Sequence, residues 1–198
     1  MSTTAAPDIV AKPRLDIGQV FKQGWRLFVK DIGPLLVATL IAFLLGAVTL
    51  GIMAGPLFAG LYGMVVARIR DGHAPEVGDV FSCLDRFWSY LGAALVLAIL
   101  IGLAWLTIVG GILLTAIWLY VFPLMVDRGM GLGEAMRVSK DMVLERGFWE
   151  HVALVLIYAI VTAIIGWPFT LVATPFAIVA VTVAYYCCSD RADAVEKA

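Results

Sequence analysis

The stretch that decides the fold lies in the middle of the chain, from Phe87 to Val126, and reads FWSYLGAALVLAILIGLAWLTIVGGILLTAIWLYVFPLMV. Its 40 residues include no Asp, Glu, Lys, Arg or His. As one continuous helix it would be roughly 60 Å long at 1.5 Å per residue, whereas the hydrocarbon core of a bilayer is about 30 Å thick. Because tilting cannot absorb a factor of two, we predict that this stretch folds back on itself as two membrane spans.

Two further stretches, Ile32–Ala67 and Val152–Ser189, are also free of these residues and have 36 and 38 residues. Near the middle of each of the three stretches stand residues that end helices and permit tight turns, namely Gly51 to Pro56, Gly110-Gly111 and Gly166-Trp167-Pro168. The sequence therefore predicts an all-α fold, a polytopic membrane helical bundle with six transmembrane helices in three hairpins. The expected spans are 33–50, 55–70, 89–108, 111–126, 148–165 and 168–187.

The composition supports this class and excludes others. Of the 198 residues, 62% are hydrophobic and 15% are charged, against about 45–50% and about 25% in soluble domains. A net charge of −1 argues against a protein that binds nucleic acid through its phosphates, and three cysteines do not make a disulfide scaffold. We expect the lipid bilayer as the main partner and no nucleic acid; a second copy of the chain or another membrane protein stays open.

The charges predict the orientation. All 14 Lys and Arg residues lie outside the three uncharged stretches, so three hairpins would place every one of them on the same side. The positive-inside rule then predicts that both termini are cytoplasmic. The first 31 residues contain no apolar run typical of a cleavable signal peptide. We expect tails at 1–13 and 190–198 around a single membrane domain, 14–189.

The segments before the hairpins resemble one another, which indicates an internal repeat. Ile17–Phe21 (IGQVF), Val77–Phe81 (VGDVF) and Leu132–Met136 (LGEAM) each begin a stretch with apolar residues at helical spacing. Such amphipathic helices lie in the membrane interface or pack on one another as a cytoplasmic layer. We predict three repeats, about 14–72, 75–129 and 130–189, each with a short amphipathic interfacial helix followed by a transmembrane hairpin.

The predicted spans offer little reactive chemistry. Their threonines are expected to bond to carbonyls of their own helices, and small residues at every fourth position from Gly51 to Ala67 predict close helix packing. His73 and His151 have no metal-ligand spacing, and no phosphate loop or nucleophile motif is present. We therefore predict no catalytic, cofactor-binding or metal-binding residues.

One polar constellation remains, at the ends of the three hairpins. If the hairpins close around an axis, these charged residues meet at one membrane level, where they form ion pairs or bind an anionic lipid headgroup or small anion. The candidate lipid or partner contacts are Arg68, Arg70, Asp71, Asp127, Arg128, Asp190 and Arg191.

Two motifs carry a resemblance to a known family. Gly55-Pro56-Leu57-Phe58-Ala59-Gly60-Leu61-Tyr62, and Pro123-Leu124-Met125-Val126-Asp127-Arg128 with Ala135-Met136 and Ser139 downstream, resemble motifs of a family of predicted bacterial integral membrane proteins of unknown function. The chain is more distantly similar to the YciC-like proteins and to the membrane domain of some glycerophosphodiester phosphodiesterases. The resemblance implies a six-helix protein of the bacterial inner membrane, and it implies no catalytic residue or substrate.

These observations favour a non-enzymatic membrane protein that acts as a scaffold, a partner or a lipid-interacting module. The alternative is a channel or transporter for a small neutral or hydrophobic solute, which would use the small-residue faces and the prolines in the spans. An enzyme acting on lipid ranks third, because no nucleophile and base stand together in the sequence.

Overall fold

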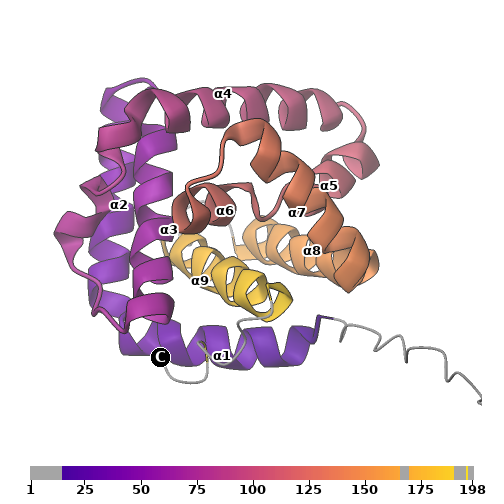
Figure 1. Ribbon diagram of the computed structural model, residues 1–198, viewed down its shortest axis with the longest axis horizontal. Coiled ribbons are helices and arrows are strands. Elements are labelled where there is room, and N and C mark those ends of the chain that lie inside the picture. Colours follow the sequence, from indigo (N-terminus) through magenta and orange to yellow (C-terminus); the bar gives the residue numbers. More distant parts are fainter. Residues whose placement is uncertain (1–14, 166–169, 190–194, 196–198) are drawn as a thin grey trace, which may run out of the picture.

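The fold is built from helices alone in the part of the chain that the computed structural model describes, residues 15–165, 170–189 and 195 (Figure 1). The all-α class is thereby confirmed. The predicted tails, apart from residue 195, and the predicted turn at Gly166-Trp167-Pro168 lie outside the described residues.

The helices follow the predicted spans to within a few residues. The helices within these spans are α2 (Ile32–Val48), α3 (Ala54–Asp71), α4 (Phe87–Ala104), α5 (Ile108–Ile117), α6 (Val121–Arg128), α8 (Phe148–Ile165) and α9 (Thr170–Cys188). Two of the three expected amphipathic helices are α-helical, α1 (Ile17–Lys30) and α7 (Leu132–Arg146). The middle one is two short 3-10 helices instead, η1 (Val77–Phe81) and η2 (Leu84–Arg86).

Several helices have the length and hydropathy of membrane spans. Among the described residues, Val77–Ala104, Ile108–Arg128 and Thr170–Cys188 meet both requirements, and the bent pairs α1–α2 (87°) and α7–α8 (106°) would raise the number to five. Large apolar side chains are exposed along these helices, as at Leu44, Leu103 and Ile108, an arrangement that suits lipid and not water. The presence of helices long and apolar enough to cross a membrane is therefore confirmed. A total of six membrane spans stays a prediction.

Helix α1 uses its apolar face for packing on the protein. Val20, Leu27 and Phe28 are buried, and a Cβ on Gly24 would lie 3.5 Å from the Cα of Ala180 in α9. This close approach fixes α1 along α9 (Figure 1). Part of the apolar face of α1 is thus covered by α9, whereas Trp25 on the same face is exposed, so the interfacial placement of α1 stays a prediction.

The fourth predicted span is broken between α5 and α6. Pro123 has no N–H to bond the carbonyl of Leu119, and its ring clashes with that carbonyl in a continuous helix. The break leaves two backbone groups without helical partners, and Ser139 of α7 forms hydrogen bonds with both. Its hydroxyl accepts from the N–H of Tyr120 at 3.2 Å and donates to the carbonyl of Ile117 at 2.8 Å.

The three hairpins are not arranged as equivalent copies. Helices α2 and α3 run side by side, and α4 crosses their end steeply (Figure 1). Gly55 makes that crossing close, since a Cβ there would lie 2.6 Å from the carbonyl oxygen of Tyr90. The internal repeat therefore stays a prediction.

Candidate functional site

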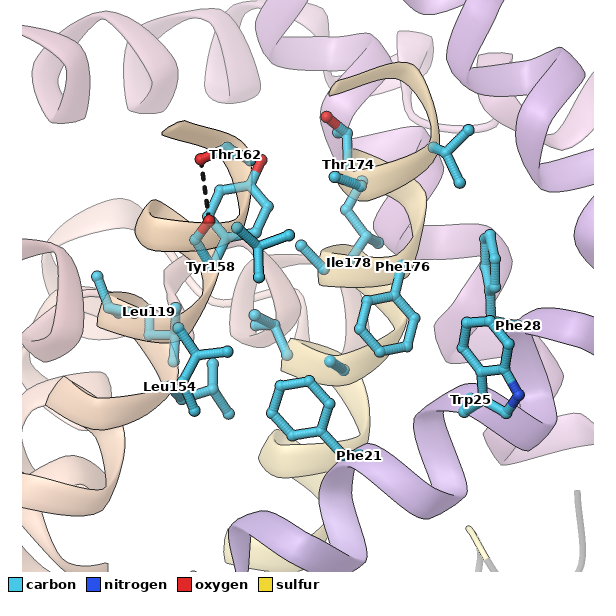
Figure 2. Close-up of a pocket in the computed structure, with 18 of the residues that line it drawn as sticks. Phe21, Trp25, Phe28, Leu119, Leu154, Tyr158, Thr162, Thr174, Phe176 and Ile178 are labelled. Carbon is cyan, nitrogen blue, oxygen red and sulfur yellow. Dashed lines mark hydrogen bonds between the residues drawn. The ribbon is translucent and has the colours of Figure 1, made fainter. Parts of the chain in front are cut away.

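An apolar cavity opens between α1, α3, α5, α8 and α9 (Figure 2). Its volume is about 450 Å³, within the roughly 300–1,000 Å³ of small-molecule sites. Helix α1 contributes Phe21, Trp25 and Phe28, and their rings gather around Phe176 of α9 at centroid distances of 5.8, 5.9 and 5.7 Å. The aromatic side chains of α1 thus form one wall of the cavity.

The opposite wall comes mainly from α8, with α5 beside it. Leu154, Tyr158 and Thr162 of α8 face the cavity (Figure 2). The hydroxyl of Thr162 donates to the carbonyl of Tyr158 at 2.9 Å, and the hydroxyl of Thr115 donates to the carbonyl of Gly111 at 2.7 Å. Because these hydroxyls already have partners on their own helices, they add little polarity, and the cavity is suited to hydrocarbon.

The charged hairpin ends meet as predicted, at least in part. Asp127 of α6 has no exposed side-chain surface, and its carboxylate lies 3.4 Å from the guanidinium of Arg70 at the end of α3. Two hydroxyls of α9 also donate to it, from Tyr185 at 2.8 Å and from Tyr186 at 3.2 Å. We call these residues, together with Asp71 and Arg128, the Asp127 cluster.

Arg128 and Asp71 complete the cluster from its edges. The Nε of Arg128 donates to the hydroxyl of Tyr185 at 3.1 Å, so Tyr185 bridges Arg128 and Asp127. Arg70 also holds the exposed carboxylate of Asp71 at 2.9 Å. The hydrogen bond from Arg70 lowers the pKa of Asp71 below the usual carboxyl value.

Arg68 lies apart from this cluster, at the corner between α1 and α2. Its Nε is 2.9 Å from the carboxylate of Asp31, with both side chains 13% exposed, and its Nη1 donates to the carbonyl of Gly72 at 3.1 Å. Arg68 thus ties the end of α3 to the α1–α2 corner. Asp190 and Arg191, the remaining predicted members, lie outside the described residues.

Sequence reasoning missed the two tyrosines of the Asp127 cluster and a second polar group in the core. There, His151 Nε2 lies 2.8 Å from the hydroxyl of Tyr120, and His151 Nδ1 lies 2.6 Å from the carbonyl of Gly147. The hydroxyl of Tyr120 is also 3.8 Å from the thiol of Cys188. The carbonyl of Gly147 requires a proton on Nδ1, so Nε2 accepts from Tyr120. All three side chains are buried, and the only advance signal was polar residues within apolar helices.

The two histidines do not come together. His73 lies 3.5 Å from Asp79 near the start of η1, whereas His151 lies in the core. Across the described residues, no three His, Cys, Asp or Glu side chains are placed to hold a metal ion.

Comparison of the chain with protein-family models, with curated proteins and with solved structures gave no match. The resemblance carried by the two motifs therefore stays a prediction.

Proposed function

We propose that this chain is an integral protein of the bacterial cytoplasmic membrane, with six spans in three hairpins and both termini in the cytoplasm. The distribution of Lys and Arg, all outside the three apolar stretches, supports this topology. Helices α3 and α6 also end alike, each with a charged last turn followed by a glycine in the left-handed conformation, Gly72 (φ 71°) and Gly129 (φ 65°). This shared ending supports a repeat that includes the first two hairpins.

Within that membrane, we propose that the protein is a non-enzymatic lipid-interacting module whose cavity holds an acyl chain. The cavity itself carries this proposal, because it lies between helices with exposed apolar surfaces and is lined almost wholly by hydrocarbon and aromatic rings. In a bilayer such a space is next to lipid tails, which are as apolar as its walls. An acyl chain can therefore enter it without losing hydrogen bonds.

The buried group of Tyr120, His151 and Cys188 supports the hypothesis that the protein is not an enzyme. Its members bond to one another and to the backbone in the core, and none of them lines the cavity. Acid–base or nucleophilic catalysis requires direct contact between the substrate and the catalytic groups. A substrate in the cavity would not make that contact with these three side chains.

Lipid binding is tested by native mass spectrometry of the purified, delipidated protein titrated with phosphatidylcholine. We expect Ala177→Phe, which fills the cavity from α9, to lower the occupancy of bound lipid at least several-fold. The matched control is Ala98→Phe on the exposed surface of α4, which should bind lipid as the wild type does. Equal lipid occupancy in all three proteins would contradict a cavity site.

A transporter for a small hydrophobic solute is the second candidate. The observation that favours it is Pro175 inside α9, between two residues of the cavity wall, Thr174 and Phe176. Proline removes a helical hydrogen bond there and gives α9 a place to bend. Solute flux into reconstituted vesicles, reduced by Pro175→Ala and by Ala177→Phe, would favour transport over static lipid binding.

The Asp127 cluster is a further proposed contact, for lipid headgroups or for a partner. Both of its cations are exposed, with 46% of the Arg70 side chain accessible. The test is the lipid preference of a variant with Arg70, Arg128 and Arg191 changed to Ala. An unchanged preference for anionic over zwitterionic lipid would remove this cluster as a headgroup site.

A further inference from the structure

The cavity walls cannot distinguish one lipid from another, because every phospholipid carries similar tails. Selectivity would have to come from polar groups at the rim of the cavity. Trp25 marks that rim, since it lines the cavity and is 60% exposed. The side chains that flank Trp25 on α1 are therefore the ones placed to meet a headgroup.

Three parallel rows run along α1. The cavity row is Phe21, Trp25 and Phe28. The residue before each of these is buried against the protein, namely Val20, Gly24 and Leu27. On the other side of the cavity row, about 100° further round the helix, come the residues that follow Phe21 and Trp25, namely Lys22 and Arg26, and both are exposed. The basic row thus borders the aromatic row on its outer side.

No acidic side chain of α1 neutralises this basic row, because the helix contains no Asp or Glu. The two aspartates that flank α1 are occupied elsewhere. Asp16 accepts from the N–H of Gln19, and Asp31 pairs with Arg68. Within the described part of the chain, neither Lys22 nor Arg26 has an ion-pair partner. Their charges are available to an anion at the rim.

We propose that the occupant of the cavity is an anionic phospholipid, with one acyl chain in the cavity and its phosphate at Lys22 and Arg26. This rests on the proposed lipid-binding function and adds the class of lipid. Charge complementarity carries it, because a basic row directly borders an apolar cavity. An amphiphile that is anionic at one end and apolar at the other fits both surfaces at once.

The experiment compares two lipids with identical acyl chains, phosphatidylglycerol and phosphatidylcholine, by native mass spectrometry of the delipidated full chain. We expect the wild type to prefer phosphatidylglycerol. We expect Lys22→Gln with Arg26→Gln to lose up to roughly 25-fold of that preference, from the interaction typical of two basic residues at an anionic surface. Binding of phosphatidylcholine should stay unchanged.

Two control variants separate the effect of losing the site from the effects of a changed total charge and of a disturbed fold. Arg137→Gln with Lys140→Gln removes the same charge from the exposed surface of α7 and should keep the preference. Lys22→Arg with Arg26→Lys keeps the charge of α1 and should also keep the preference for phosphatidylglycerol. That result would show that α1 tolerates substitution at these two positions.

Four results separate the possible failures. A preference that survives Lys22→Gln with Arg26→Gln overturns the headgroup assignment, and so does a preference that falls equally in the α7 control. If Ala177→Phe still binds both lipids like the wild type, the cavity proposal itself is wrong. Loss of both lipids in Ala177→Phe, with the preference unaffected by the α1 variants, leaves a lipid-binding cavity without an α1 headgroup site.

Discussion

At the scale of the residue, the glycines of the first motif act as packing surfaces. Gly55 lets the backbone of α4 approach α3, and Gly60 does the same for η1. Tyr62 stacks on Phe122 with ring centroids 6.0 Å apart and lines the cavity. The small residues at every fourth position predict a packed face, and the structure confirms it at Gly55, whereas Gly60 lies outside that series.

Gly60→Ala tests the closest of these contacts. A Cβ at position 60 would occupy the place of the carbonyl oxygen of Val80, so η1 must move. We expect the free energy of unfolding to fall by roughly 1–3 kcal/mol, the typical cost of overpacking, measured by thermal unfolding in detergent. Gly92→Ala, in mid-α4 with open space around it, should be neutral or slightly stabilising. Equal stability of the two variants would contradict the placement of η1.

Asp127→Asn tests the buried centre of the Asp127 cluster. The substitution removes the negative charge opposite Arg70 and weakens the acceptor of the two tyrosine hydroxyls. We expect a loss of roughly 1–3 kcal/mol in the free energy of unfolding, measured by the same thermal unfolding. Tyr186→Phe removes one of these hydrogen bonds and should cost less. A variant as stable as the wild type would show that Asp127 is not the centre of the cluster.

The pKa of Asp71 predicts a small pH dependence. Because its folded-state pKa is lowered by Arg70, the stabilisation is present above the usual carboxyl pKa and is lost as the pH falls through the lowered value. Asp71→Asn should therefore unfold at a slightly lower temperature than the wild type at pH 7. The difference should narrow as the pH falls below the usual carboxyl value, and a difference that does not change with pH would rule out this pair as its source.

Which charged residues meet could be predicted only in part from the sequence. The spacing of the hairpin ends was enough to expect Arg70, Asp71, Asp127 and Arg128 at one level. It gave no indication that α9 would supply Tyr185 and Tyr186, because two adjacent aromatic residues at the end of an apolar helix more commonly serve as core. Arg68 joins Asp31 instead, because α3 packs along α2 and its last turn lies at the α1–α2 corner.

At the scale of the element, most helix bounds could be predicted because charge and glycine mark them. The 3-10 form of η1 and η2 could not, since Val77–Phe81 has the apolar spacing of an α-helix. The backbone of Val80 lies against Gly60 of α3, a tertiary contact that apolar spacing does not encode. The exact place of the break before α6 was likewise outside the prediction, although Pro123 was visible in the sequence.

Ser139→Ala tests how that break is held. The hydroxyl satisfies the N–H of Tyr120 and the carbonyl of Ile117, and alanine would leave both buried without a partner. We expect a loss of roughly 1–3 kcal/mol in the free energy of unfolding. Thr162→Val removes a hydroxyl that bonds only to its own helix and should have a smaller effect. A larger effect from Thr162→Val would contradict this role of Ser139.

At the scale of the whole molecule, the length of the apolar stretches predicts hairpins, but it contains no information about how the hairpins pack. The steep crossing of α4 over α2 and α3 (Figure 1) depends on Gly55 meeting Tyr90 and Ala94. The cavity depends on α1 packing along α9. Both arise from contacts between residues far apart in the sequence, which periodicity does not encode.

The proposed topology requires all charged segments to lie on one side of the membrane. Reporter fusions test this most directly, with alkaline phosphatase and green fluorescent protein joined in turn after Leu50, His73, Leu106, Met130 and Ala198. We predict phosphatase activity only at Leu50 and Leu106, and fluorescence at the other three sites. Fluorescence at Leu50 or Leu106, or phosphatase activity at Ala198, would contradict the proposed topology.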